Sequence, residues 1–273
     1  MALTDTTRSA DGTKIVYHRI GSGPPLVIVH GTLATTEMYR PIADLLSEHY
    51  QVVLVERRDY GISGSGARPA VFARQAEDLA AVLGELDGPA DVFGHSCGGL
   101  VAMHALTIGA ASIRAIALYE PPVAMAGGAL TAILGRCREL LRAGCPQDAI
   151  AAFLSAVGDN VSDADVRPIA TLLAHRADGM VADLECVTAT PTDLSQWPAR
   201  TVPTLLLTGE ATDEYARRSI ALLQRHLPAA ATITLPGQGH HPDDAMLMAT
   251  ELRAFFADAR ADAGDLTDDW GYT

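Results

Sequence analysis

The sequence predicts an α/β fold in which helices cover both faces of a mostly parallel sheet. Short β-rich runs alternate with longer Ala- and Leu-rich helical runs along the 273 residues. Such alternation of strands and helices is typical of parallel sheets. Several strand candidates are continuously apolar, as in LVIVH, VVLVE and PTLLLTG. Strands without a polar face are expected where helices cover a sheet on both sides.

The expected elements begin with DGTKIVYHRIGSGPP, whose strand and Gly/Pro turn indicate an antiparallel edge of the sheet. The strand candidates are Lys14–Ile20, Leu26–His30, Gln51–Glu56, Ala90–His95, Ile113–Glu120, Thr204–Thr208 and Thr232–Leu235. The helices expected between and after them are Glu37–Glu48, Ala70–Leu86, Gly98–Gly109, Glu214–His226 and Asp243–Arg260. This order places a helix after most strands, as a parallel sheet requires.

One segment breaks the alternation, because residues 121–203 contain helical patches and no convincing strand. The patches are Ala129–Ala143, Pro146–Val157, Ala164–Arg176 and Asp178–Thr190. Helices inserted after a strand of a parallel sheet lie over its carboxyl ends, where such sheets bind ligands. We therefore predict a core of residues 1–122 and 197–260, a helical cap of residues 123–196 and an acidic tail of residues 261–273. Ordinary crossover helices are the alternative to a cap.

Composition and charge exclude several classes of function. The chain is 48% hydrophobic, which is too apolar for a disordered protein, and it has no run near the roughly 20 apolar residues that cross a bilayer. Its formal net charge of −13 opposes binding to nucleic acid or to anionic membranes. Four dispersed cysteines and an N-terminus without an apolar signal indicate a cytoplasmic protein. The expected partner is a small-molecule substrate, and a homodimer is left open.

The strongest motif is Gly94-His95-Ser96-Cys97-Gly98, which follows the apolar run ADVF and precedes the helical run LVAMHAL. A GxSxG sequence between a strand and a helix forms a sharp turn that exposes the serine hydroxyl. The glycines permit the strained backbone and the close packing of strand and helix. Ser96 is therefore the candidate nucleophile. The amide of Cys97, near a helix N-terminus, is a candidate donor to an oxyanion.

Two further loops carry candidate residues. His30-Gly31-Thr32 ends the apolar strand LVIV, and the amide of Thr32 is the expected second oxyanion donor. The His30 side chain is expected to brace this loop through hydrogen bonds. Late in the chain, PGQGHH follows the short strand TITL and supplies the expected base. A histidine can take the serine proton and return it to the leaving group, and we choose His240 over His241.

The order HGT, then GHSCGG, then a late GxGH resembles the α/β-hydrolase superfamily, from Thr13 to about Ala257 apart from the cap. The segment ERRDYGISG at residues 56–64 is similar to the D-x-R-G-x-G-x-S segment of that family, with Glu in place of its first acid. The resemblance implies an eight-stranded sheet, a helical cap and a nucleophile–acid–histidine triad. Serine at the turn distinguishes the chain from haloalkane dehalogenases and epoxide hydrolases, which use aspartate there.

The acid of this triad has more than one candidate. Chain order in the fold places the acid between the serine and the histidine, and the family commonly shows G-x-x-D after the seventh strand. In the run TGEATDE that position is Thr212, and Asp213 follows it. Some relatives place the acid after the sixth strand, where this chain has Glu120 in the run YEPP. Glu210, or no acid at all, is the third alternative.

Together these residues predict a serine hydrolase that needs no cofactor or metal. It would cleave an ester, lactone or thioester of a small to medium apolar compound through an acyl-enzyme. The sequence contains no phosphate-binding loop and no dinucleotide fingerprint. A lyase or cofactor-independent oxygenase on the same fold is one alternative, and a non-catalytic ligand-binding protein is another.

Overall fold

An eight-stranded sheet forms the centre of the computed structural model, which describes residues 3–108, 112–158, 163–197, 202–241 and 243–265. Its strand order is β1-β2-β4-β3-β5-β6-β7-β8. The strands are β1 (Leu3–Arg8), β2 (Lys14–Ile20), β3 (Pro25–Val29), β4 (Gln51–Glu56), β5 (Ala90–His95), β6 (Ile113–Tyr119), β7 (Thr204–Gly209) and β8 (Ala231–Leu235). The pairs β1–β2 and β2–β4 are antiparallel and the other pairs are parallel, which confirms the predicted class.

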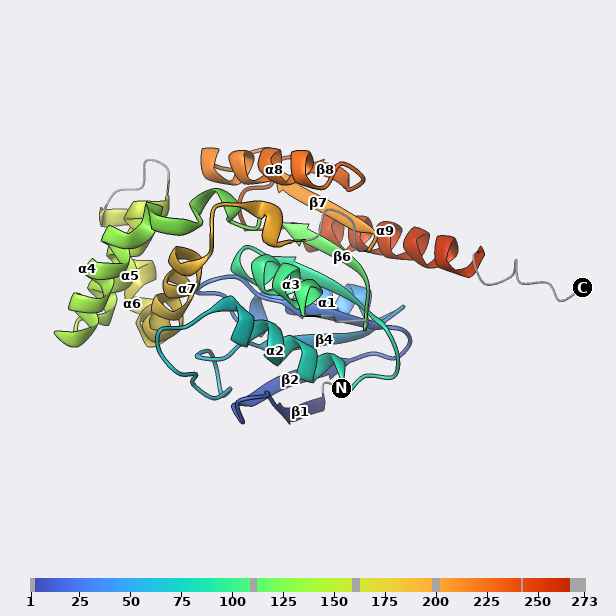
Figure 1. Cartoon of the computed structure of the whole chain (residues 1–273), viewed down its shortest axis with the longest axis horizontal. Helices are drawn as coiled ribbons and strands as arrows, with labels where there is room; N and C mark the ends of the chain where they lie inside the picture. The colour runs from blue at the N-terminus through green and yellow to red at the C-terminus, as the bar shows by residue number, and fades with distance from the viewer. Residues whose placement is uncertain (1–2, 109–111, 159–162, 198–201, 242, 266–273) are drawn as a thin grey trace, which may run out of the picture.

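Helices cover both faces of this sheet (Figure 1). They are η1 (Thr36–Tyr39), α1 (Arg40–Leu46), α2 (Phe72–Leu83), α3 (Cys97–Thr107), α8 (Glu214–His226) and α9 (Ala245–Asp265). One apolar core lies between the sheet and α2, α3 and α8, and a second lies between the sheet and α1 and α9. In β3, Val27 and Val29 belong to the first core, whereas Leu26 and Ile28 belong to the second. Both faces of β3 are therefore buried in apolar cores, which explains why its sequence is continuously apolar.

The sequence pattern missed the first strand, β1. It pairs antiparallel with β2 at the edge of the sheet. All six of its residues, LTDTTR, are exposed or half-buried. The strand therefore has no apolar face that a pattern could reveal. The antiparallel pairing expected for the opening segment is confirmed, but β2 lies one strand in from the edge.

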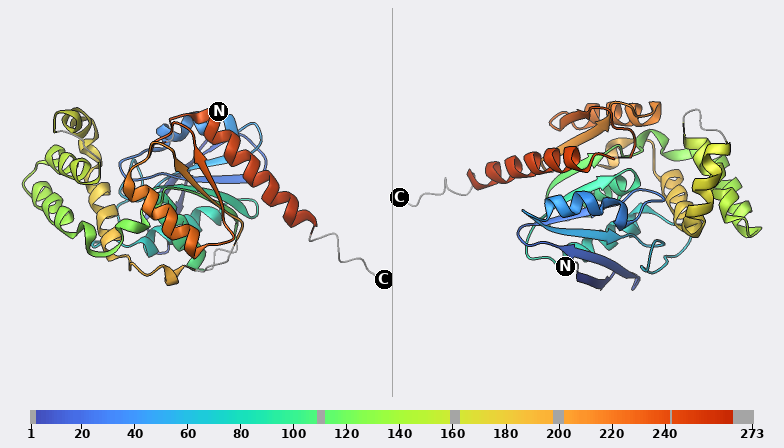
Figure 2. Two further views of the ribbon diagram at one scale, coloured as in Figure 1. Left: turned by 90° about the horizontal axis from the view of Figure 1, so that it is seen from above. Right: turned by 180° about the vertical axis from the view of Figure 1, so that it is seen from behind.

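Between β6 and β7 the chain forms a group of helices, which we call the helical insert (residues 123–196). Its helices are η2 (Val123–Met125), η3 (Gly127–Leu130), α4 (Thr131–Arg142), α5 (Pro146–Val157), α6 (Asp163–Leu173), η4 (Ala174–Arg176), α7 (Ala177–Ala189) and η5 (Leu194–Gln196). The described part of the insert contains no strand, as predicted. Helices α4 to α7 share an apolar core to which Leu33, from the loop after β3, contributes. Figure 2 shows them gathered at one end of the sheet.

The last helix is longer than the sequence indicated. We expected it to end at Arg260, before an acidic tail of residues 261–273. Instead, α9 continues to Asp265, and residues 266–273 lie outside those that the structure describes. The end of α9 projects beyond the sheet in Figure 1. None of the helices in the described ranges is long and apolar enough to cross a membrane.

Gly98 allows α3 to pack directly against the end of β3. A Cβ atom on Gly98 would lie 2.1 Å from the carbonyl oxygen of Val29 and 2.6 Å from that of His30. Because these are backbone atoms, which cannot move aside as a flexible side chain can, we expect Gly98→Ala to lower the free energy of unfolding in urea by about 3 kcal/mol. Gly135→Ala is the matched control, since a Cβ there meets no described atom within 4 Å. It should raise stability by about 0.5–1 kcal/mol. Small effects of both substitutions would contradict the close approach at Gly98.

Candidate active site

Ser96 occupies the turn between β5 and α3, where the GxSxG motif placed it. Its backbone angles are φ 52° and ψ −124°, a combination that is rare for residues other than glycine. Its amide donates to the carbonyl oxygen of Tyr119, at the end of β6, over 2.8 Å. A Cβ atom on Gly31 would lie 3.0 Å from the Cβ of Ser96, so this glycine lets the loop after β3 lie against the serine. Strain of this kind is concentrated at functional sites.

The two predicted oxyanion donors lie next to this serine. The amides of Thr32 and Cys97 have no hydrogen-bond partner among the described residues, and both residues line the same cavity as Ser96. Cys97 is the first residue of α3, where backbone amides lack partners within the helix and the helix dipole is positive. Burial raises the pKa of the Cys97 thiol to about 12, so its sulfur is not a nucleophile near neutral pH.

Glu120 and His240 form a hydrogen-bonded pair beside the serine turn. Nδ1 of His240 lies 2.7 Å from Oε2 of Glu120. Glu120 follows β6 and is 1% exposed, whereas His240 follows β8 and is half-buried. Only β7 separates these two strands in the sheet, so the loops at their carboxyl ends are neighbours. The contact therefore depends on strand order, although 120 residues separate the two side chains.

Three other donors converge on the Glu120 carboxylate. Thr208 Oγ1 and the amide of Gly209 donate to Oε1 over 2.9 and 2.8 Å, and Thr212 Oγ1 donates to Oε2 over 2.8 Å. Burial alone would raise the pKa of Glu120, but the hydrogen bonds from His240, Gly209 and Thr212 outweigh burial and lower this pKa. Glu120 therefore stays a carboxylate that accepts the Nδ1 proton of His240.

The other candidate acids make different contacts. Asp213 lines the cavity, but its Oδ1 accepts the amide of Ala216 over 2.7 Å and caps the start of α8. Glu210 accepts the amide of Gly237 over 2.9 Å. All three acids lie in the described part of the chain, and among them only Glu120 has a hydrogen bond or ion pair with His240.

Two side chains that the sequence analysis did not select hold the loop of His240. His95 Nε2 donates to the carbonyl oxygen of His240 over 2.8 Å, and the Tyr119 hydroxyl donates to that of Gly239. Burial and the neighbouring histidines lower the pKa of His95 well below its usual range. Its neutral ring accepts from the Tyr39 hydroxyl at Nδ1. His95 lies inside the GxSxG motif, but no local signal indicated a role in holding a loop 145 residues away.

The candidate residues open onto one cavity of about 520 Å³. Ser96, Glu120 and His240 line it where the strands end, and the helical insert supplies most of its apolar wall. The insert residues with apolar side chains in this wall are Met125, Leu130, Phe153, Leu154, Val157, Ile169, Leu172, Leu173, Leu184 and Val187. The volume lies within the roughly 300–1,000 Å³ typical of small-molecule sites.

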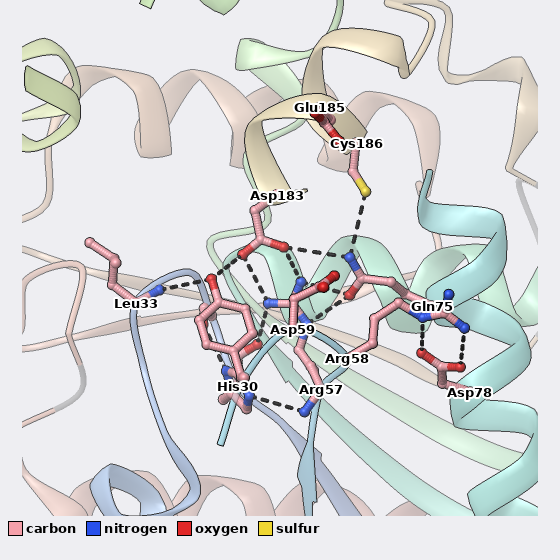
Figure 3. Close-up of polar contacts among 12 residues, drawn as sticks. His30, Leu33, Arg57, Arg58, Asp59, Gln75, Asp78, Asp183, Glu185 and Cys186 are labelled. Carbon is pink, nitrogen blue, oxygen red and sulfur yellow. Dashed lines mark hydrogen bonds and ion pairs between the residues drawn. The ribbon is translucent and has the colours of Figure 1, made fainter. Parts of the chain in front are cut away.

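A buried polar network connects the loop after β3 to the insert (Figure 3). His30 Nδ1 donates to the carbonyl oxygen of Gly31 over 2.8 Å, and Nε2 accepts the amide of Arg57 over 3.3 Å. Burial, with Arg57 nearby, lowers the pKa of His30 to about 3, so the ring is neutral. These hydrogen bonds confirm that His30 braces its loop. Arg57 in turn pairs with Asp183 of α7, a buried acid that the sequence analysis did not select.

The sheet, the serine turn and the inserted helices define an α/β-hydrolase. Comparison with known proteins agrees, because the sequence matches the alpha/beta hydrolase family over residues 26–259. This chain therefore belongs to that family.

Individual relatives are similar over different parts of the chain. An alpha/beta hydrolase from Sphaerobacter thermophilus DSM 20745 superimposes with a TM-score of 0.81 at 30% identity, covering 92% of this chain and 100% of that one. A thermophilic esterase from Thermogutta terrifontis superimposes with a TM-score of 0.77 at 20% identity, covering 95% of this chain and 99% of that one. This likeness shows the shared fold alone. Pimeloyl-[acyl-carrier protein] methyl ester esterase from Xanthomonas oryzae pv. oryzae is 35% identical over 86 residues, which is 32% of each chain. The match thus spans about a third of that enzyme.

Proposed function

We propose that this protein is a serine hydrolase that cleaves an ester, lactone or thioester of a small to medium apolar compound. The observation that carries the proposal is the Glu120–His240 pair, which opens onto the same apolar cavity as the strained Ser96. The partial match to a methyl ester esterase, 35% identical over 86 residues, supports the same class of reaction.

In the first half of the reaction, Ser96 Oγ forms a bond to the substrate carbonyl carbon while His240 Nε2 takes the serine proton. The π electrons of the carbonyl move to its oxygen, and the amides of Thr32 and Cys97 donate hydrogen bonds to the resulting oxyanion. Glu120 holds the Nδ1 proton of His240, which orients the ring and stabilises its positive charge.

The intermediate then collapses to an acyl-enzyme. The oxyanion re-forms the carbonyl, the bond to the leaving oxygen or sulfur breaks, and His240 gives its proton to the leaving group. A water molecule repeats the sequence, with His240 again as the base, and releases the acid and free Ser96. The helical insert acts as a cap in this scheme, because its apolar side chains line the volume in which the substrate lies.

A fluorophosphonate tests this proposal, since it forms a covalent adduct only with an activated serine. We expect intact mass spectrometry to show one adduct on the wild-type protein and none on Ser96→Ala. Ser219→Ala is the matched control, because Ser219 lines the same cavity and its hydroxyl accepts the amide of Ala124 over 3.1 Å. This variant should keep the adduct.

Turnover of p-nitrophenyl acetate, butyrate and octanoate then tests hydrolysis itself. We expect the wild-type protein to cleave at least one of these esters and Ser96→Ala to cleave none above background. A folded wild-type protein without an adduct would overturn the proposal. An adduct without turnover of any ester or thioester would favour a lyase that uses the same serine.

A further inference from the structure

We propose that Asp183 of the helical insert is a positioning residue, which acts through Tyr60 and Arg57 to hold the amide of Thr32 in the oxyanion hole. The inference rests on the proposed function and extends it, because it makes the insert part of the catalytic geometry as well as part of the cavity wall. It concerns the His30 loop, which we define as His30–Leu33.

Tyr60 makes the first connection between this loop and the insert. Its hydroxyl accepts the amide of Leu33 over 3.3 Å and donates to Oδ2 of Asp183 over 2.7 Å. The hydroxyl donates its single proton to the Asp183 carboxylate, so its oxygen can accept the hydrogen bond from the Leu33 amide. Leu33 has a φ of 61°, a left-handed conformation that a leucine keeps only where its surroundings hold it.

Arg57 makes the second connection. Its Nη1 donates to the carbonyl oxygen of His30 and to Oδ2 of Asp183, each over 3.2 Å, and its Nη2 pairs with Oδ1 of Asp183. Both charged side chains are only 2% exposed. A buried charge that loses its partner is strongly unfavourable, so each member of the pair holds the other in place. In Figure 3, Asp183 reaches from the insert helix toward Arg57 and the neighbourhood of His30.

These contacts flank Thr32 on both sides. The amide of Gly31 donates to the Tyr39 hydroxyl over 3.3 Å, and the carbonyl oxygen of Gly31 accepts from His30 Nδ1. The amide of Leu33 is held by Tyr60. Thr32 lies between these two residues, and its amide has no partner among the described residues. Its direction is therefore set by its neighbours, and displacement of such a group by about 1 Å can slow a reaction about 100-fold.

The test measures the rate at which a fluorophosphonate reacts with Ser96, because the phosphoryl oxygen occupies the oxyanion hole in that reaction. Tyr60→Phe removes only the hydroxyl that joins Leu33 to Asp183. We expect it to react about 10- to 100-fold more slowly than the wild-type protein. With a p-nitrophenyl ester, kcat should fall by the same factor while KM stays within a few-fold. Asp183→Asn, which keeps the shape of the side chain, should slow the reaction at least as much.

Asp78→Asn is the matched control. Asp78 pairs with Arg58 through two hydrogen bonds of 2.6 Å, and it is 4% exposed. Figure 3 shows this pair beside the network, and neither residue has a hydrogen bond to the His30 loop among the described contacts. We expect Asp78→Asn to lower the melting temperature as Asp183→Asn does, but to react with the fluorophosphonate at the wild-type rate.

The outcomes separate the two proposals. A wild-type protein that does not react would refute the proposed function, and the positioning role would fall with it. A wild-type protein that reacts, together with a Tyr60→Phe variant that reacts equally fast, would refute the positioning role alone. Equal slowing of Tyr60→Phe and Asp78→Asn would also refute it, because the effect would then follow general destabilisation. If Asp183→Asn does not fold, Tyr60→Phe decides the outcome.

Discussion

Substitution of His240 by asparagine is expected to lower kcat for an ester substrate by at least about 10⁴-fold. The variant keeps the backbone carbonyl that His95 holds, so the loop should retain its position. It removes the only group that we assign to take the serine proton and return it to the leaving group. The measurement is the steady-state hydrolysis of a p-nitrophenyl ester, with circular dichroism to confirm the fold.

His241→Asn provides the comparison for this experiment. His241 also lines the cavity and its ring lies 5.7 Å from that of His240, but its side chain has no hydrogen bond among the described contacts. We expect only a few-fold change in kcat. Comparable losses of kcat in both variants, or a larger loss in His241→Asn, would contradict the assignment of His240 as the base.

Glu120→Gln is expected to lower kcat by about 10⁴-fold while the protein remains folded. Four donors point at the two carboxylate oxygens, from His240, Thr208, Gly209 and Thr212. An amide has one acceptor oxygen and one NH₂ group, so at least one of these donors would face another donor. Either the ring of His240 adopts the wrong tautomer or the loop moves. Both changes leave Nε2 unable to accept the serine proton.

Asp213→Asn tests the competing assignment. Asparagine caps helices as well as aspartate does, so α8 should keep its N-terminus and kcat should stay near the wild-type value. A loss as large as that of Glu120→Gln would assign the acid to Asp213. The double variant Glu120→Gln/Thr212→Asp is a further check, because Thr212 already lies 2.8 Å from Glu120 and stands at the family's usual acid position. It should recover part of the lost turnover.

Much of the fold and part of the site could be predicted from local sequence. Continuous apolar runs such as that of β3 identify strands that are covered on both faces, and the two cores confirm this reason. The position of Ser96 follows from a turn of five residues, so local geometry determines it. Strand β1 escaped prediction because none of its side chains is buried.

The acid could not be chosen from the sequence for a physical reason. Asp213 and Glu120 each follow a strand in a loop at the same edge of the sheet, so chain order and spacing allow both. The choice depends on the contacts of each side chain: Asp213 caps the N-terminus of α8, whereas Glu120 lies within hydrogen-bonding distance of His240. That distance is set by packing between residues 120 positions apart, and no local pattern encodes it.

The sequence by itself thus determined the class of fold, the serine turn and the late histidine loop, because each depends on contacts between residues close in the chain. Only the tertiary structure paired Glu120 with His240 and Asp183 with Arg57 and Tyr60. These pairs join loops and helices that are distant in sequence. Their geometry arises when the sheet and the helical insert pack together, since burial and hydrogen bonding then select one partner for each charged group.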